Sequence, residues 1–344
     1  MGEGLTFQQK ELDKVLENIG RPKEKRVPID SKYKRRSVIV ISGPTCSGKT
    51  DLSLVLAQSL GGEIISADSM QVYRGMDIGT AKVTAEQQEL VMHHLVDIRD
   101  VNDPITVSDF FVEAHKACES ITARNRIPIV VGGSGFYLRA FLHGIPSGPP
   151  SVPEVRKEFE HEAETLGVEV LYDWLQLQDP EYAATITNRD KQKIVRALEI
   201  IALTGEKVSA FVWKYRPLLP DYNFHCWFIH RPRSSLYSRV EERCDRMLED
   251  GLLDEIEALE KTGMLKNPSA CQAIGYRQGI EFLKTDRSPE QYEEFVRVFK
   301  KASRHYVKRQ FTWFRKDPVF TWLDVDLHDI ETASDIIMQD YMSW

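Results

Sequence analysis

A loop bounded by two glycines, set between an apolar run and an amphipathic pattern, constrains this chain most. The run Val38–Ile41 leads into Gly43-Pro-Thr-Cys-Ser-Gly-Lys-Thr50, which fits the pattern G-x-x-x-x-G-K-[ST]. Gly43 and Gly48 permit backbone conformations closed to other residues, so consecutive N–H groups can turn toward phosphate oxygens at a helix N-terminus. Apolar residues at helical spacing follow: Leu52, Val55, Leu56 and Leu60. The sequence therefore predicts a strand, a phosphate-binding loop and a helix.

Two side chains at the end of this loop suit a particular ligand. Lys49 adds a point charge between two phosphates, and the Thr50 hydroxyl is placed to bind a phosphate-bound Mg²⁺. The pattern thus predicts a site for a diphosphate or triphosphate. It does not say which phosphorylated molecule binds.

Composition narrows the class of protein. Of the 344 residues, 42% are hydrophobic and 28% are charged, and no apolar run approaches the roughly 20 residues of a membrane helix. The formal charge of −7 discourages a nucleic-acid partner unless the basic residues cluster. The five cysteines lie apart without a C-x-x-C pair, which argues against a zinc site and a disulfide framework. A reducing, cytoplasmic location fits best, with no membrane contact.

The order of composition and pattern predicts the domain organisation. Residues 1–36 are polar, and their acidic residues argue against an organelle transit peptide, so we interpret them as a mobile leader. The proline-rich stretch 146–153 predicts a linker, and helical patterns then continue to about Pro217. An aromatic strand follows at 223–230. We therefore expect an α/β core over 37–146 and 223–344, with an all-helical insertion over 147–222.

Further strands of this core bring polar residues toward the loop. Strands are predicted over 61–67, 94–98 and 127–131, with a helix over 107–124. Parallel sheets bind ligands at the carboxyl ends of their strands, so Asp68 should face the phosphate loop. There it can act as a base or metal partner, or cap the following segment, and its position leaves both interpretations open.

Glycines end the strand over 127–131. Nucleotide-hydrolysing enzymes of this architecture usually carry an acidic residue there, and this chain has Gly132-Gly-Ser-Gly135 instead. We expect these glycines to let the backbone approach a ligand closely, with Ser134 as a hydroxyl contact.

Basic residues in the second half offer candidate phosphate contacts. A helical region over 236–259 places Arg239, Arg243 and Arg246 on one face, which suits either a diphosphate or salt bridges to neighbouring acids. Residues 297–316 contain eight Lys or Arg and no acid. One helical face there carries Arg297, Lys300, Lys301, Arg304 and Lys308, and the opposing face carries Phe295, Phe299, Ala302 and Tyr306. A basic stripe of this kind suits a phosphate backbone.

Five motifs together resemble those of the tRNA dimethylallyltransferases. They are Gly43-Pro-Thr-x-Ser-Gly-Lys-Thr50, Asp68-Ser-x-x-Val-Tyr-Arg-Gly-Met-Asp-Ile-Gly-Thr-Ala-Lys82, Gly132-Gly-Ser-Gly-x-Tyr-Leu138, Ile274-Gly-Tyr-Arg-Gln278 and Lys308-Arg-Gln-x-Thr-Trp-Phe-Arg315. The resemblance covers about residues 37–320, and its second motif is long enough to be highly specific. It implies an α/β fold, a P-loop NTPase-like parallel sheet flanked by helices with an all-helical insertion domain.

The resemblance also implies a reaction: transfer of a dimethylallyl group from dimethylallyl diphosphate to N6 of adenosine 37, next to the tRNA anticodon. Asp68 would be the general base, Arg243 would hold the diphosphate, Ser134 would stand in for a threonine, and Mg²⁺ would bind Thr50. The diphosphate would lie against Gly43, Thr45, Cys46, Ser47, Gly48, Lys49 and Thr50. The implied tRNA contacts are Asp68, Ser69, Met70, Gln71, Ser134, Arg156, Gln192, Lys193, Arg196, Tyr276, Arg277 and Gln278.

This sequence departs from the family pattern in small ways. Cys46 replaces an alanine or glycine, which leaves the loop backbone usable and adds an oxidisable thiol. The C-terminal zinc finger of some eukaryotic relatives is absent from this sequence, so the anticodon stem-loop must be held by the helical insertion and the basic helix. Gln192 and Arg196 share a helix face that, by itself, indicates a solvated surface. A monomer is expected.

Three alternatives stay open at the level of sequence. Adenylate isopentenyltransferases use free nucleotides and share the loop and Asp68, but they need neither a long insertion nor a basic helix. A small-molecule kinase would turn over ATP with a phosphoryl acceptor. A non-catalytic RNA-binding module would keep its cellular role after Asp68→Ala.

Overall fold

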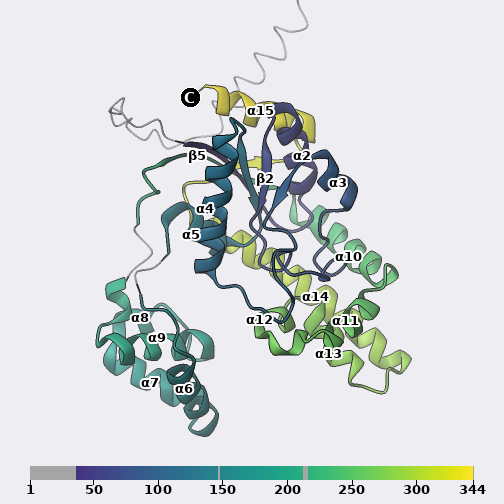
Figure 1. Ribbon diagram of the computed structural model, residues 1–344. Helices are drawn as coiled ribbons and strands as arrows, with labels where there is room; N and C mark the ends of the chain where they lie inside the picture. Colours follow the sequence, from purple (N-terminus) through teal and green to yellow (C-terminus); the bar gives the residue numbers. More distant parts are fainter. Residues whose placement is uncertain (1–35, 146–147, 212–215, 344) are drawn as a thin grey trace, which may run out of the picture. The chain divides into compact units, whose positions relative to one another are not determined.

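The computed structural model describes residues 36–145, 148–211 and 216–343, which fall into two compact units (Figure 1). The first unit comprises the chain up to Leu142 and again from Leu219, and the second is His143–Leu218. Apart from Arg36, the predicted leader lies outside the described residues. No described helix is long and apolar enough to cross a membrane.

The first unit is built on a parallel sheet, which confirms the predicted fold class. Its strand order is β3-β2-β4-β1-β5-β6, and every pairing is parallel. The strands are β1 (Arg36–Ser42), β2 (Glu63–Ser66), β3 (His93–His94), β4 (Pro128–Gly132), β5 (Tyr222–His230) and β6 (Thr321–Asp324). Because β1 lies between β4 and β5, the loop that follows β1 emerges near the middle of the sheet edge.

The third strand is much shorter than predicted. The sequence pattern predicted a strand over 94–98, but β3 ends at His94. Leu95 and Asp97 have φ values of 64° and 54°, in the left-handed region, which is incompatible with an extended strand. The apolar alternation at 94–98 therefore belongs to an irregular segment, which makes one isolated parallel bridge between Arg99 and Tyr73.

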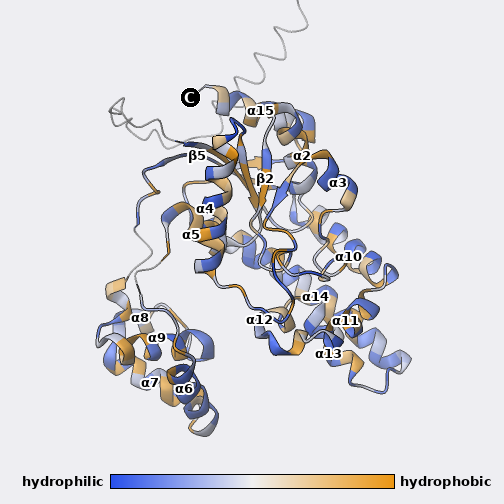
Figure 2. Ribbon diagram, in the orientation of Figure 1, coloured by the Kyte–Doolittle hydropathy of each residue, from blue (hydrophilic) through white to orange (hydrophobic). Residues whose placement is uncertain are grey.

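Helices cover both faces of the sheet because side chains of a strand alternate between faces. Ile39, Ile41 and Trp227 share a core with the helices α2 (Lys49–Leu60) and α15 (Ile330–Met342). On the other face, Phe224 meets Phe141 of α5 (Gly135–His143) with ring centroids 5.7 Å apart. In Figure 2 the central strands are mostly orange, while the outer sides of the helices are largely blue.

The C-terminal half of the first unit is mainly helical. The helical region predicted over 236–259 consists of two helices, α10 (Arg233–Glu249) and α11 (Leu252–Lys261). Gly251 separates them with φ 97°, a conformation that favours glycine. The remaining helices of this unit are α3 (Ala85–Leu90), α4 (Val107–Ala123), η2 (Met264–Lys266), α12 (Pro268–Cys271), α13 (Tyr276–Leu283) and α14 (Pro289–Phe314).

The second unit is helical, with α6 (Pro153–Thr165), α7 (Val168–Gln178), α8 (Pro180–Ala183), α9 (Lys191–Thr204) and η1 (Val208–Phe211). Its core gathers apolar residues of these helices, including Leu171, Leu175 and Ile194. At one side of α9, Glu199 is fully buried, and its carboxylate accepts hydrogen bonds from Ser151 Oγ and Val152 N, each over 2.7 Å.

Candidate active site

The carboxyl ends of three adjacent strands bring the sequence motifs to one edge of the sheet. Strand β1 leads into residues 43–48, called the phosphate loop below. Strand β2 leads into Asp68, and β4 leads into Gly133. The Ser42 hydroxyl donates to Gly132 O over 3.0 Å and ties the ends of β1 and β4 together. This edge is where parallel α/β sheets bind ligands.

The phosphate loop presents backbone donors without acceptors. Within the described residues, no acceptor meets the N–H groups of Cys46, Gly48, Lys49 and Thr50. The Ser47 hydroxyl is buried and likewise has no hydrogen-bond partner in the described part of the chain. Gly48 has φ 98° and caps α2, so the positive end of the helix dipole adds to the donors. The loop is therefore suited to an anion with several oxygens.

The ammonium group of Lys49 is turned back on its own loop. It donates to Gly43 O over 2.9 Å and to Pro44 O over 2.7 Å. The pKa of Lys49 is lowered to about 8, chiefly by burial; the positive charge of Arg243 adds to this shift, while Cys46 and Asp68 oppose it. An anion bound in the loop would favour the charged lysine and raise this pKa again.

We expect the affinity for an organic diphosphate to fall as the pH rises through about 8, because a deprotonated Lys49 contributes no charge. Below this pH Lys49 is charged and attracts the diphosphate fully, so the affinity is highest there and falls as the lysine loses its proton. Titration calorimetry with a non-hydrolysable organic diphosphate between pH 7 and 9.5 measures the effect. Lys49→Arg stays charged and should remove the step. A wild-type profile that is flat across this range would contradict the assignment.

Three arginines from the C-terminal half contact the phosphate loop. Arg243 Nη1 donates to Thr45 Oγ1 over 2.6 Å, and its Nη2 donates to Thr80 O over 3.3 Å. Arg239 Nε donates to Cys46 O over 3.2 Å, and Arg231 Nε donates to Ser47 O over 3.1 Å. Sequence reasoning selected Arg243 and missed the contact of Arg231, which follows β5 directly and carries no motif.

Asp68 caps a turn at the edge of the sheet where the phosphate loop lies. Its Oδ1 accepts from Met70 N over 2.8 Å and from Gln71 N over 3.3 Å. Its other carboxylate oxygen has no hydrogen bond within the described residues. Burial raises the pKa of Tyr306, and the nearby Asp68 charge adds to the rise. Asp68 also acts on the charge of Lys49. Its two interpretations are therefore compatible, and its role as base stays a prediction.

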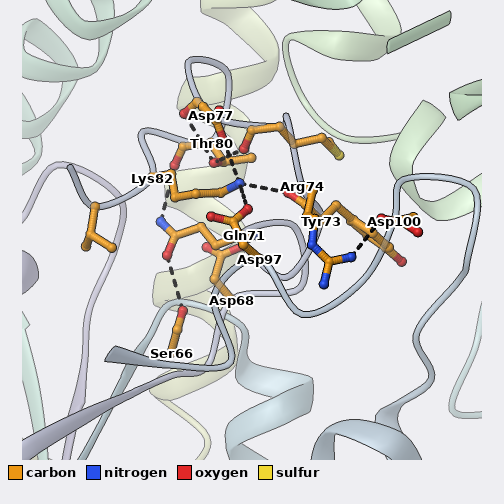
Figure 3. A network of polar contacts seen from close by, with 12 residues as sticks. Ser66, Asp68, Gln71, Tyr73, Arg74, Asp77, Thr80, Lys82, Asp97 and Asp100 are labelled. Carbon is orange, nitrogen blue, oxygen red and sulfur yellow. Dashed lines mark hydrogen bonds and ion pairs between the residues drawn. The ribbon is translucent and has the colours of Figure 1, made fainter. Parts of the chain in front are cut away.

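A network of polar contacts joins distant parts of the loop over residues 68–82 (Figure 3). Gln71 Oε1 accepts from Ser66 Oγ over 3.2 Å, and its Nε2 donates to Ala81 O over 3.4 Å. The side chain of Lys82 is 4% exposed, and its ammonium donates to a backbone carbonyl and two carboxylates. These partners are Tyr73 O, Asp77 and Asp97, at 2.7, 2.5 and 2.6 Å. The motif over 68–82 thus includes residues from both ends of one loop, and these residues contact each other.

Glu255 of α11 holds the tip of this loop, and the sequence analysis did not find it. Its carboxylate accepts from the N–H groups of Asp77, Ile78 and Gly79 at 2.9, 2.7 and 3.2 Å. Tyr276 OH donates to the same carboxylate over 2.6 Å. A Cβ on Gly79 would lie 2.5 Å from the Tyr276 ring, so this packing requires glycine. A glutamate in an amphipathic helix gives no sign of such a role.

The motif at 274–278 is mostly internal. Tyr276 is fully buried, and Gln278 is 3% exposed and accepts from Gly275 N through Oε1 over 2.9 Å. Arg277 alone of the three predicted tRNA-binding residues has an exposed side chain. In this arrangement Tyr276 and Gln278 support the surface and do not present their side chains to it. RNA contact by any of these three residues stays a prediction.

The glycines after β4 make room for protein groups, which corrects the expectation of close approach to a ligand. A Cβ on Gly132 would lie 2.2 Å from Ala67 O, one on Gly133 would lie 2.3 Å from Gln310 Nε2, and one on Gly135 would lie 2.3 Å from the Trp313 ring. Ser134 lies between them, half-buried, and its carbonyl accepts the Leu138 N–H at the start of α5.

The remaining loop residues have side chains that are at least partly accessible. Ser69 and Met70 are half-buried beside Asp68, and Thr50 is exposed on the first turn of α2. The Cys46 side chain is half-buried, and its φ of 64° is unusual for a residue other than glycine. Thr45 Oγ1 lies 3.9 Å from Cys46 Sγ.

The predicted tRNA-binding residues of the second unit divide into two kinds. Arg196 and Arg156 approach the buried Glu199 carboxylate at 2.8 and 4.0 Å. Burial opposes ionisation of Glu199, but hydrogen bonds from Arg196 and Ser151 outweigh it and lower its pKa. Gln192 and Lys193 are exposed. The arginines thus have a structural partner, and RNA contact by all four residues stays a prediction.

The basic stripe of α14 is partly neutralised, which corrects its interpretation as an open phosphate track. Lys300 Nζ lies 2.6 Å from Asp245, and Arg304 pairs with Glu241, so both hold α14 against α10. Arg297 pairs with Glu294 over 2.5 Å. Exposed cations without a salt bridge to any described residue are Lys301, Lys308, Arg309, Arg315 and Lys316.

Comparison with known proteins places this site in a family. A family model described as IPP transferase matches residues 71–317. A tRNA dimethylallyltransferase of Protochlamydia amoebophila is 56% identical over 331 residues, which cover 96% of each chain. The chain belongs to the IPP transferase family. Another tRNA dimethylallyltransferase, from Chlamydia pneumoniae, is 49% identical over 306 residues, 89% of this chain and 88% of that protein.

Solved structures of IPP transferases share the fold. A tRNA isopentenylpyrophosphate transferase from Bacillus halodurans has a TM-score of 0.65 and 38% identity, and the match covers 90% of this chain and 98% of that one. A eukaryotic dimethylallyltransferase acting on tRNA has a TM-score of 0.74 and 30% identity, with 90% of this chain and 80% of that chain covered. The family model begins inside the second motif and ends just after α14, so it includes Arg243, Glu255 and Tyr276.

Proposed function

We propose that this chain transfers a dimethylallyl group from dimethylallyl diphosphate to N6 of adenosine 37 in tRNA. One observation carries the proposal: the phosphate loop, the Arg243 guanidinium that contacts it and the carboxylate of Asp68 lie at the same edge of the sheet, and the charge of Asp68 acts on Lys49. A site for a diphosphate leaving group thus lies next to a group that can accept a proton. The names of the relatives, tRNA dimethylallyltransferases, support the same reaction.

The leaving group sets the main chemical task. Adenine N6 is a poor nucleophile because its lone pair is delocalised into the ring, whereas an allylic carbon stabilises positive charge as diphosphate departs. Lys49, Arg243 and the loop N–H groups stabilise the negative charge that develops on the diphosphate. Mg²⁺ would bind the Thr50 hydroxyl and diphosphate oxygens, and would supply further charge stabilisation.

The proton of N6 leaves late in this reaction. A carboxylate is far too weak a base to deprotonate a neutral exocyclic amine. Asp68 accepts the proton only after the C–N bond begins to make N6 cationic, so its charge stabilises the transition state as well. Its capped turn keeps the carboxylate in place through the bonds from Met70 and Gln71.

The target adenosine must leave its stack to reach this site, at a cost of a few kcal/mol. Contacts elsewhere on the tRNA offset this cost. We assign them to the exposed residues Gln192, Lys193 and Arg277, and to the free cations of α14. The protein acts as a monomer on this proposal, in a cytoplasmic, reducing environment that suits its five free cysteines.

Prenyl transfer with parallel acceptors tests the function. Labelled dimethylallyl diphosphate and Mg²⁺ are offered with an unmodified anticodon stem-loop in one tube and with AMP in another. We expect label in the RNA alone. Label in AMP alone would make the protein an adenylate isopentenyltransferase and would overturn the RNA contacts. A stem-loop with guanosine at the target position is the matched control, because it removes the exocyclic amine from that ring position.

The salt dependence of RNA binding should divide the cations of α14 into two classes. Lys301→Gln with Lys308→Gln should weaken stem-loop binding and lower the slope of log affinity against log salt by about 0.7 to 0.9 for each lost phosphate contact. Lys300→Gln with Arg304→Gln should lower the thermal midpoint, because these residues pair with α10. An unchanged slope in the first variant would make that face merely solvated.

A further inference from the structure

Gln310 of α14 joins the phosphate loop to the end of β4 with both halves of its amide. Oε1 accepts from Thr45 N over 3.0 Å, and Nε2 donates to Gly133 O over 3.0 Å. The side chain is 4% exposed, so water cannot replace either partner freely. The two segments it joins follow neighbouring strands, β1 and β4.

The bond to Thr45 bears directly on the loop conformation. Thr45 precedes Cys46, whose N–H group lacks an acceptor among the described residues. A fixed position of the Thr45 backbone limits how the Cys46 N–H group and the Thr45 hydroxyl can turn. Arg243 donates to this same hydroxyl over 2.6 Å. Gln310 therefore orders the loop at the point where Arg243 meets it.

The chain makes room for this amide at one position. Gly133 leaves the space that Gln310 Nε2 occupies, since a Cβ there would lie 2.3 Å from that nitrogen. A hydrophobic side chain at position 310 would suffice if the helix only needed packing, because Val307 and Phe314 already bury the same face. A bidentate amide opposite a glycine indicates a more specific requirement.

We propose that Gln310 is a positioning residue that holds the phosphate loop in its diphosphate-binding conformation by bracing Thr45 against Gly133. The inference rests on the proposed function only in that the bound anion is a diphosphate. It assigns no contact between Gln310 and substrate. Its effect is on diphosphate affinity and not on RNA affinity.

Two substitutions of Gln310, to methionine and to glutamate, test this positioning role. Gln310→Met keeps the shape and loses both hydrogen bonds, so we expect the affinity for a non-reactive thio analogue of dimethylallyl diphosphate to fall about tenfold or more. Affinity for the stem-loop should stay within about twofold, because no hydrogen bond of Gln310 faces RNA. Calorimetry on the full chain measures the first and fluorescence anisotropy the second. An unchanged diphosphate affinity overturns the proposal.

Gln310→Glu provides a readout that a merely structural residue would not move. A protonated carboxyl can accept from Thr45 N and donate to Gly133 O as the amide does, whereas a carboxylate cannot donate. Burial raises the pKa of a carboxyl group, so diphosphate affinity relative to wild type should recover as the pH falls from about 8 to 5.5. A ratio to wild type that is independent of pH would contradict the bridging geometry.

Two further variants separate positioning from stability. Gly133→Ala should displace the amide and reduce diphosphate affinity about as much as Gln310→Met. The double variant should bind the diphosphate as tightly as whichever single variant binds it less tightly, because both changes remove the same interaction. Ser303→Ala is the control, since Ser303 is another buried polar residue of α14 and bonds Phe299 O. It should leave diphosphate affinity unchanged. If wild-type protein binds the diphosphate but transfers nothing to RNA, the proposed function fails while this test still applies.

Discussion

Replacing Asp68 by asparagine is expected to lower turnover by about 10²-fold or more without weakening RNA binding. The asparagine carbonyl can still accept from Met70 N and Gln71 N, so the turn keeps its cap. What is lost is the negative charge and the ability to take the N6 proton. Single-turnover transfer to the stem-loop measures the chemical step, and anisotropy measures RNA affinity.

Alanine at position 68 separates the role of the cap from that of the base. Asp68→Ala loses the cap as well as the base, so it should show the same loss of turnover. Its free energy of unfolding should also fall by about 1 kcal/mol, which is measured as a lower thermal midpoint. Asn and Ala variants with equal stability would mean that the cap contributes nothing. An Asn variant that keeps wild-type turnover would remove Asp68 from the chemistry.

Replacing Arg243 by alanine is expected to lower turnover by about 10²- to 10³-fold, the usual effect of removing one donor to a developing anion. The guanidinium bridges Thr45 Oγ1 and Thr80 O, so it also joins the phosphate loop to the loop that carries Asp68. Arg243→Lys keeps the charge but cannot reach both atoms with one planar group, and should recover only part of the activity.

Arg246 provides the matched control for this experiment. It lies on the same helix, one turn further on, and it is exposed, with no hydrogen bond or ion pair to another described side chain. Arg246→Ala should leave turnover within about twofold of wild type. Equal losses in the two variants would mean that the charge of α10 as a whole matters, and not the contact with Thr45.

The elements that could be predicted from the sequence depend on local interactions. The phosphate loop, its strand and its helix are fixed by glycine conformations and apolar spacing within about fifteen residues. The helix over 107–124 begins with a capping box, and Thr106 and Asp109 form it in the structure. Arg243 was selected by spacing and resemblance, and the structure brings it to Thr45.

The failures arise where the decisive partner is distant in the sequence. No local pattern distinguishes a glycine that admits a ligand from Gly133, which admits Gln310. Tyr276 is a tyrosine in a polar motif, yet its hydroxyl is buried against Glu255. Lys300 and Arg304 belong to an acid-free segment, and their acidic partners lie on another helix, α10. Charge counted along one segment cannot reveal such pairing.

The separation between Thr45 and Gln310 has a consequence for how the protein is made. Their hydrogen bond spans 265 positions of the chain. At about 5 to 20 residues per second, roughly 13 to 53 s pass on the ribosome between synthesis of one partner and of the other. During that interval the strand and the first helix can form, but the brace is missing. A chain that ends before α14 therefore has a phosphate loop without this hydrogen bond, and we expect it to bind the diphosphate more weakly than the full chain.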